Sequence, residues 1–180
     1  MFKRILYWLG GGKLVEDYNR YVKLRHQTFF KLFLYYPEFR YQLYYRLREH
    51  STMMKLILKP LNLVNTLNLY INCSDIGGGL FIEHGFSTII SCKKIGRNCW
   101  INQQVTIGYS DSVNSPTIGD NVSIKAGAKV IGGVKIGDDC IIGANAVVVK
   151  DVPAHSIVVG VPAKVIKSRR SINDQWEKVL

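Results

Sequence analysis

Histidine is the residue type in this chain best suited to moving a proton, because its ordinary pKa of about 6.5 lies near neutral pH. The 180 residues contain four histidines: His26, His50, His84 and His155. His84 follows Glu83, an acid that could orient its ring or contact a substrate. A lone histidine is more often structural than catalytic, so residue type alone leaves the choice open.

The four cysteines are scattered along the chain without a CxxC pair: Cys73, Cys92, Cys99 and Cys140. This spacing favours buried, reduced thiols over disulfides or a zinc site. We therefore expect no metal ion.

An aliphatic residue recurs every six positions through the second half of the chain. The series is Ile76, Ile82, Ile95, Ile101, Ile107, Ile118, Ile124, Val130, Ile136, Ile142 and Val148. A period of six fits neither an amphipathic helix nor an alternating strand. It predicts a prism of short flat faces, in which each aliphatic side chain points inward and stacks on the coils above and below.

The six-residue register breaks twice, between Ile82 and Ile95 and again between Ile107 and Ile118. The second break contains residues 108–117, a polar and turn-rich stretch. We expect a loop that leaves the prism, and such loops are either functional or tolerated insertions.

The N-terminal third differs in composition from the rest. The formal net charge is +8 over residues 1–60 and +3 over residues 61–180, and 14 of the 20 aromatic residues precede residue 61. Apolar stripes predict helices over residues 13–58. We expect a helical region at 1–68, a β-helix domain at 69–166 and a tail at 167–180.

The basic and aromatic helices allow three interpretations: packing on the β-helix and on neighbouring subunits, contact with an anionic membrane surface, or nucleic-acid binding. No nucleic-acid motif accompanies the charge, so nucleic acid is not expected. No stretch reaches the ~18 apolar residues of a spanning helix, and no secretory signal is evident. A cytoplasmic protein is expected, at the inner face of the membrane if the helices bind lipid.

Residues 71–166 resemble the hexapeptide acyltransferases, and within them the serine acetyltransferase branch. The matching stretches are 76–85 (IGGGLFIEHG), 105–108 (VTIG), 118–129 (IGDNVSIKAGAK), 142–149 (IGANAVVV) and 158–165 (VVGVPAKV). The resemblance implies a left-handed parallel β-helix preceded by helices. It also implies a homotrimer with acetyl-CoA in the groove between adjacent subunits.

The resemblance makes His84 the catalytic base, because it stands where the family has its histidine. Glu83 is a candidate to assist it or to contact the acceptor, or else a solvated acid at a corner. Asn102 is a further candidate acceptor contact, while Trp100 could face the groove or pack between subunits.

Two departures from the family concern the acceptor. The Asp that the family has about fifteen residues before its histidine is replaced by Leu69. The Arg-His pair that holds serine is replaced by Asn114 and Ser115, before Pro116. We keep Asn114 and Ser115 as candidate acceptor contacts, but the groups for binding an amino acid's carboxylate are missing.

The resemblance also implies a set of contacts with CoA, from small residues, backbone groups and two lysines. They are Gly108, Ala126, Gly127, Gly143, Ala144, Val161, Pro162, Lys164 and Lys167. Gly108 could donate its N–H to the thioester carbonyl, and the lysines suit phosphate. Lys167 could equally be an ordinary surface lysine.

These features predict an O-acetyltransferase that moves acetyl from acetyl-CoA to a hydroxyl group. The segment 36–46 resembles N-terminal pieces of polysaccharide O-acetyltransferases, so a sugar of a surface-polysaccharide precursor is the expected acceptor. The alternatives are serine O-acetyltransferase of cysteine biosynthesis and a β-helix that binds without catalysing.

Overall fold

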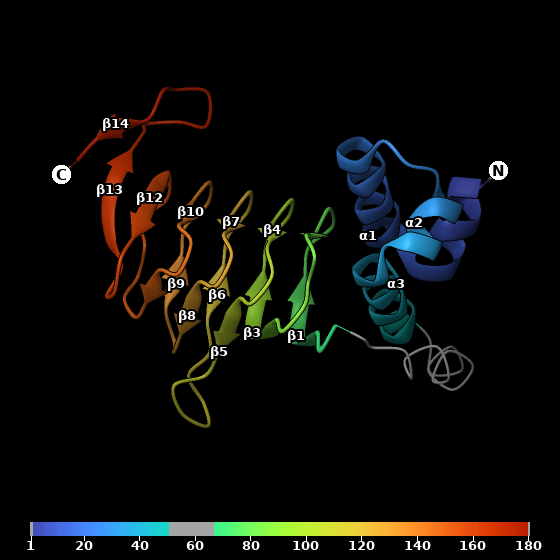
Figure 1. The fold of residues 1–180 in the computed structure, drawn as a ribbon, viewed down its shortest axis with the longest axis horizontal. Coiled ribbons are helices and arrows are strands. Elements are labelled where there is room, and N and C mark those ends of the chain that lie inside the picture. The colour runs from blue at the N-terminus through green and yellow to red at the C-terminus, as the bar shows by residue number, and fades with distance from the viewer. Residues whose placement is uncertain (1, 51–66, 180) are drawn as a thin grey trace.

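The computed structural model describes residues 2–50 and 67–179 of the chain, as a helical region joined to a parallel β-helix (Figure 1). The helices lie at one end of the β-helix and the C-terminal strands lie at the other (Figure 1). Among the described residues, no helix is long and apolar enough to cross a membrane.

Within residues 2–50 the chain forms three helices: α1 (Phe2–Arg25), α2 (Phe29–Tyr35) and α3 (Pro37–His50). The prediction that helix begins at residue 13 was wrong, since α1 starts at Phe2 and is interrupted at Gly11 (φ 71°). A glycine permits that positive φ, so helix continues on both sides of the kink. Pro37 opens α3, where its fixed φ suits the first turn. The predicted helix over residues 53–58 lies outside the described residues.

The rest of the described chain is built from short strands. They are β1 (Tyr70–Ile76), β2 (Phe81–Ile82), β3 (Ile89–Ile95), β4 (Trp100–Ile101), β5 (Thr106–Gly108), β6 (Thr117–Ile118), β7 (Ser123–Ile124), β8 (Lys129–Ile131), β9 (Lys135–Ile136), β10 (Ile141–Ile142), β11 (Val147–Val148), β12 (Ser156–Val159), β13 (Lys164–Ser168) and β14 (Glu177–Lys178).

Parallel pairing between successive coils gives the β-helix three faces. One face carries β2, β4, β7, β10 and β12 in order. Strand β3 crosses a corner, because its start pairs with β5 on the second face and its end pairs with β6 on the third. The predicted β-helix with a helical N-terminal region is therefore confirmed.

The predicted six-residue series forms the core. All eleven aliphatic side chains are at most 3% exposed and belong to one apolar cluster. Ile118 pairs with Ile136, three hexads further along the chain, so equivalent positions stack directly. Stacking of this kind buries apolar surface that no single coil could bury alone.

Both register breaks are turns at corners of the prism. The polar stretch after β5 leaves the prism as a loop over residues 109–116, which projects downward in Figure 1. The turn over residues 83–88, which contains His84, is two residues longer than its counterpart at 102–105, because Ile82 pairs with Ile101 and Ile90 pairs with Ile107. The predicted loop is confirmed as a structure.

The N-terminal end of the β-helix is closed by side chains of α1 and α3. The hydroxyl of Tyr21 accepts a hydrogen bond from the Ile82 N–H (3.1 Å) and donates one to the Ile82 carbonyl (3.0 Å). Asp17 accepts from the N–H of Leu80 (2.9 Å), and Gln42 donates to its carbonyl (2.9 Å). These side chains satisfy backbone groups at an edge that has no further coil to pair with.

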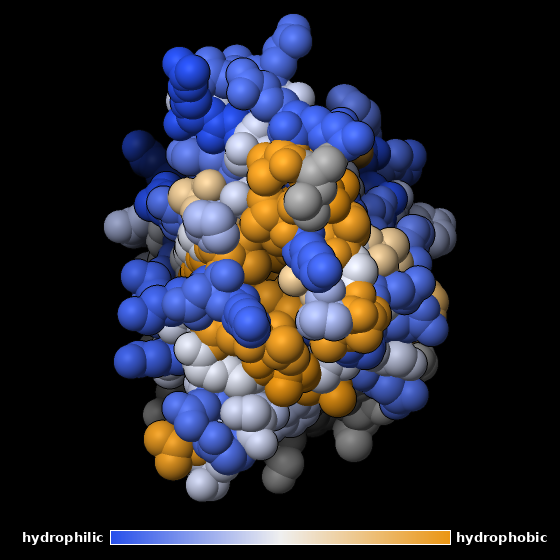
Figure 2. All heavy atoms as spheres, turned by 90° about the vertical axis from the view of Figure 1, so that its left-hand side faces the viewer, coloured by the Kyte–Doolittle hydropathy of each residue, from blue (hydrophilic) through white to orange (hydrophobic). Residues whose placement is uncertain are grey.

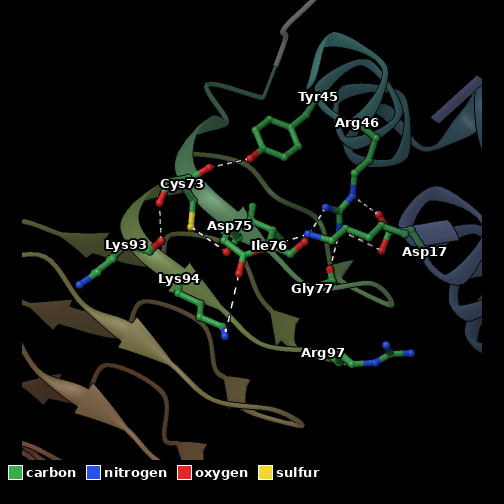
Figure 3. A network of polar contacts seen from close by, with 12 residues as sticks. Asp17, Tyr45, Arg46, Cys73, Asp75, Ile76, Gly77, Lys93, Lys94 and Arg97 are labelled. Carbon is green, nitrogen blue, oxygen red and sulfur yellow. Dashed lines mark hydrogen bonds and ion pairs between the residues drawn. The ribbon is translucent and has the colours of Figure 1, made fainter. Parts of the chain in front are cut away.

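A buried ion pair completes this closure (Figure 3). Arg46 of α3 binds Asp17 of α1, with its Nε 2.8 Å from Oδ2, and both side chains are at most 3% exposed. The same guanidinium donates to the carbonyls of Ile76 (2.8 Å) and Gly77 (2.6 Å). Arg46 thus joins both helices to the first coil.

The C-terminal end is closed by antiparallel strands, since β12 pairs with β13 and β13 with β14. Strand β13 runs across the predicted boundary at residue 166. Figure 2 faces this end and shows apolar side chains gathered at its centre with hydrophilic ones around them. Val159 of β12 and Val179, directly after β14, remain exposed at 37% and 53%.

Candidate active site

The turn over residues 83–88 presents His84 at the corner between the faces of β2 and β3. His84 has a φ of 64°, and Gly85 beside it has a φ of 60°. The His84 side chain is exposed, whereas Gly85 is buried beneath it. Histidine tolerates this left-handed region better than most residues do. The ring is therefore accessible to a substrate while its backbone is fixed from below.

Glu83 is held by the next coil. Its Oε2 accepts hydrogen bonds from the indole N–H of Trp100 and from the Asn102 amide, both at 3.1 Å. Trp100 packs edge-on against Phe81, with ring centroids 5.0 Å apart, so its orientation is fixed in turn. Glu83 is thus an oriented acid and not a freely solvated one.

Two charged residues of the helical region reach this turn, and sequence reasoning did not find them as site residues. Arg25, at the end of α1, lies 3.7 Å from Glu83 and 3.9 Å from Glu38, measured between guanidinium nitrogen and carboxylate oxygen. Arg25 also stacks over the rings of Tyr36 and Phe81. Only the docking of α1 and α3 on the β-helix brings these charges together.

Glu38 lies in the first turn of α3 and is 4% exposed. Burial raises the pKa of its carboxyl group, while the charges of Arg25 and His84 act in the opposite direction. The net pKa stays above the ordinary value. A β-carbon placed on Gly85 would lie 3.3 Å from the Glu38 Cβ, so α3 packs closely beneath the turn.

Leu69 stands directly beside the same turn. Its Cδ2 would lie 3.5 Å from a β-carbon on Gly85, and its side chain is 1% exposed. The position that carries an Asp in the resembling family is therefore next to the His84 turn, but here it contributes apolar packing only.

The candidate CoA contacts of the later coils fall on one corner, which we call the His84 corner. Its turns follow β2, β4, β7, β10 and β12 and span residues 83–88, 102–105, 125–128, 143–146 and 160–163. Backbone hydrogen bonds join successive turns, from Gly127 to Gln103 and from Asn145 to Ala126. Of the predicted residues, this corner carries His84, Glu83, Asn102, Ala126, Gly127, Gly143, Ala144, Val161 and Pro162.

Gly127 shows why one of these positions is glycine. Its φ is 73°, and an added β-carbon would collide with the side-chain oxygen of Asn145 in the next turn. The turns of the His84 corner can therefore stack closely and leave backbone groups near the surface. Lys164 and Lys167 follow on β13, and both are exposed.

Gly108, Asn114 and Ser115 lie at a different corner, between β5 and β6, which we call the loop corner. Within one chain the structure does not bring these three residues to His84. Asp111 organises the loop: its carboxylate accepts from the Asn114 amide (2.7 Å) and from the Val113 N–H (2.8 Å). These bonds, the Asn114 amide first, lower the pKa of Asp111 to about 2.

A cavity of about 540 Å³ lies beside this loop. Arg48 and Lys93 line it together with Tyr109 and Ser115, and no acidic residue is among its lining residues. The loop corner therefore offers positive charge close to a candidate acceptor contact.

Of the other histidines, His155 lies at the C-terminal end of the β-helix. The Nδ1 of His155 lies 2.9 Å from Asp139, which also binds Arg169, so His155 serves the C-terminal closure. His26 follows α1 and is exposed. The side chain of His50 lies outside the described residues.

The four cysteines are buried and form no disulfide, and the Cys92 thiol donates to the Cys73 sulfur at 3.1 Å. Burial raises the pKa of Cys99 to about 12 and that of Cys140 to about 11, so both thiols stay protonated at neutral pH. Over residues 2–50 and 67–179, no three histidine, cysteine or acidic side chains are grouped to hold a metal ion.

A family model matches part of the repeat. Residues 115–150 match the family model described as bacterial transferase hexapeptide (six repeats). These residues run from the end of the loop to β11, so the match covers the central coils of the β-helix.

Among curated relatives, the serine acetyltransferase of Mycobacterium tuberculosis is 50% identical over 95 residues, which is 51% of this chain and 42% of that protein. The serine acetyltransferase of Staphylococcus xylosus is 46% identical over 99 residues, 52% of this chain and 45% of that protein. The chain thus spans less than half the length of these two relatives.

Solved serine acetyltransferases share the fold. One in complex with CoA is 22% identical, with a TM-score of 0.66 over 91% of this chain and 73% of that one. The Neisseria gonorrhoeae enzyme in complex with serine is 28% identical, with a TM-score of 0.61 over 83% of this chain and 66% of that one. These matches cover the helices as well as the β-helix.

Proposed function

We propose that this protein is an acetyl-CoA-dependent O-acetyltransferase with His84 as its general base. The observation that carries the proposal is the accessible His84 ring, at a corner whose stacked turns carry most of the candidate CoA-binding residues. The family match and the serine acetyltransferase relatives support the same reaction class.

In the proposed reaction, a ring nitrogen of His84 takes the proton of the acceptor hydroxyl as its oxygen attacks the thioester carbonyl of acetyl-CoA. The tetrahedral intermediate then expels the CoA thiolate, which receives a proton, and the acetyl ester remains. Backbone N–H groups near the thioester carbonyl would stabilise the oxyanion. Gly108 is the candidate donor of this kind.

Acetyl-CoA is proposed to lie along the His84 corner as a co-substrate. Gly127, Gly143 and the turn at Val161 and Pro162 offer small side chains and backbone groups there. Lys164 and, less directly, Lys167 would meet the phosphates. Because Gly108, Asn114 and Ser115 lie at the loop corner, a neighbouring copy would have to supply them. A homotrimer with the site between subunits fits this requirement.

L-Serine is the acceptor that the relatives favour, because those named are serine acetyltransferases and one solved structure of this kind holds serine. The charges beside His84 suit an amino acid: Glu83 for its ammonium group and Arg25 for its carboxylate. The products would be O-acetylserine and CoA, as in cysteine biosynthesis.

A sugar hydroxyl is the second candidate. It is favoured by the replacement of the family's Arg-His pair by Asn114 and Ser115, which suit neutral hydroxyls better than a carboxylate. A β-helix that only binds is the third, and it predicts no turnover with any acceptor.

The deciding experiment follows CoA thiol release from acetyl-CoA with L-serine and, separately, with a panel of sugars and nucleotide sugars. We expect turnover with serine, and a loss of about 10²–10⁴-fold in His84→Ala with its fold and oligomeric state retained. Turnover with sugars alone would select the second candidate. Near-normal turnover in His84→Ala would remove the proposed base.

Membrane contact through the helical region stays a prediction. Tyr7 and Trp8 of α1 are 64% and 77% exposed, next to the basic Lys3 and Arg4. Basic and aromatic surfaces of this kind adsorb to anionic lipid. Flotation with anionic vesicles at low salt should recover the protein, and Trp8→Ala should weaken that recovery. No recovery of the unaltered protein would exclude it.

A further inference from the structure

The turn that carries His84 rests on a carboxylate from a different part of the chain. Glu38 of α3 lies beneath Gly85, the residue after His84, with a Cβ-to-Cβ approach of 3.3 Å if Gly85 bore a β-carbon. Through Arg25, Glu38 is also connected to Glu83, the residue before His84. Glu38 is therefore next to one neighbour of the candidate base and is linked through Arg25 to the other.

The carboxylate of Glu38 is shielded from water, because only 5% of its side chain is exposed. Charge interactions are screened much less at such a position than at the surface. Glu38 also interacts electrostatically with the imidazolium form of His84, although no hydrogen bond joins them. The two charges are therefore close enough to attract each other.

The β1 side of the turn offers no such charge, since Leu69 fills it with a buried apolar side chain. An imidazole that must gain a proton beside Leu69 alone would become charged against apolar surface, which is unfavourable. The nearby acid comes from the helical region instead.

We propose that Glu38 is the positioning residue of His84, a role that rests on the proposed function of His84 as the base. When His84 takes the acceptor's proton, the ring becomes an imidazolium, and the Glu38 carboxylate stabilises that positive charge. The proton stays on His84 until it is passed to the leaving thiolate. Glu38 keeps its charge throughout and touches neither substrate.

Several charged groups face this pair. Glu83 lies on the turn itself and adds negative charge. Arg25 of α1 lies between Glu83 and Glu38 and offsets part of it, and Arg40 of α3 acts on Glu38 in the same sense. From the neighbouring coil, Lys125 stacks over Trp100 at 5.0 Å. With two carboxylates around Arg25, removal of the Glu38 charge leaves Glu83 as the acid paired with that guanidinium.

The test compares the pH dependence of kcat in the full-length protein and in Glu38→Gln, which removes the charge and keeps the shape. We expect the plateau kcat to fall about tenfold, because the charged His84 ring loses its interaction with the Glu38 carboxylate. The acidic limb of the profile should move to lower pH, because protonation of His84 becomes less favourable. The KM for acetyl-CoA should change little, since Glu38 lies below the site.

Two further variants separate charge from structure. Glu38→Asp keeps the carboxylate and should retain the position of the acidic limb, with a smaller loss of kcat. Asp75→Asn removes a half-exposed carboxylate that pairs with Lys13 and should change neither kcat nor the limb. A fall in kcat in Glu38→Gln with an unmoved limb would indicate a structural role only and would overturn the proposal.

A readout without turnover makes this test independent of the acetyl-transfer proposal. In protein labelled at its histidine rings, the NMR signal of His84, assigned by its loss in His84→Asn, should titrate over a lower pH range in Glu38→Gln. If the signal shifts but no acceptor is acetylated, the proposed function fails and the contact stands. If the signal titrates identically in both proteins, the contact fails whatever the activity.

Discussion

The two ends of the β-helix are closed by different means. At the N-terminal end, Asp17, Tyr21 and Arg46 of the helices satisfy the backbone of the first coil from buried positions. At the C-terminal end, β13 and β14 fold back as antiparallel strands, and several of their side chains are exposed. The end that carries His84 is thus fixed by side chains, and the other end is fixed by backbone pairing.

This difference has a consequence for the site. A strand closes an edge through backbone hydrogen bonds, which most side chains allow. At the N-terminal end each closing hydrogen bond comes from a side chain and therefore depends on one residue type. Substitutions should therefore be costly at the helical closure, and most costly where they strand a buried charge.

The largest expected effect is that of Arg46→Met. It leaves Asp17 buried without its partner and removes donors from the carbonyls of Ile76 and Gly77, so we expect a loss of about 3–5 kcal/mol in the free energy of unfolding. Urea unfolding at fixed protein concentration measures it. The matched control, Arg48→Met, removes an arginine that stacks over Tyr45 and should cost less than about 1 kcal/mol.

Similar losses in the two arginine variants would mean that the ion pair contributes no more than the stacking of Arg48. The N-terminal closure would then not depend on the buried ion pair for its stability, and the two ends would not differ in this respect.

A smaller effect is expected from Tyr21→Phe, which removes only the hydroxyl. The N–H and carbonyl of Ile82 lose their partner in the strand that leads to His84, at a cost of about 1–3 kcal/mol. Hydrogen exchange should show faster exchange of the Ile82 amide. Tyr7→Phe, at a site 64% exposed, serves as the control and should lie within about 0.5 kcal/mol of the unaltered protein. Unchanged exchange at Ile82 would contradict the side-chain closure.

The β-helix could be predicted from the sequence because each hexad carries its own signal. Ile118, for example, is expected to point inward from its place in the hexad, whichever coil it stacks on. The loop at 109–116 can be predicted because the six-residue series is interrupted there. Local patterns of this kind do not depend on how distant parts of the chain dock.

The candidate site could be predicted only in part, for the opposite reason. His84, Glu83 and Asn102 lie within the repeat, and their stacking follows from its register. Glu38 and Arg25 reach the same turn only through helix docking, which no local pattern encodes. Nothing in the spacing of the sequence connects Arg25 to residue 83. The helical residues before Gly11 were not predicted, because glycine has a low helix propensity and three glycines stand at 10–12.

The smallest expected effect is the change in stability at acid pH, which should differ between the two ends of the β-helix. Burial raises the pKa of Asp139, but its bonds to Arg169 and His155 outweigh this, so its net pKa is lowered. Its contribution to stability is complete above the unfolded value of about 3.9 and is lost as pH falls through the folded value.

The N-terminal acids respond with the opposite sign. Burial raises the pKa of Asp17 more than Arg46 lowers it, and Glu38 is raised as well, so both take up protons more readily in the folded state. Acidification from neutral pH therefore stabilises their end relative to the unfolded chain. Hydrogen exchange, corrected for its intrinsic pH dependence, should show β13 and β14 losing protection below about pH 4 before α1 and α3 do. If α3 lost protection first, the order of the two closures would be the reverse of the one proposed. That result would mean that the N-terminal closure depends more on an ionised Asp17 than the C-terminal closure depends on an ionised Asp139.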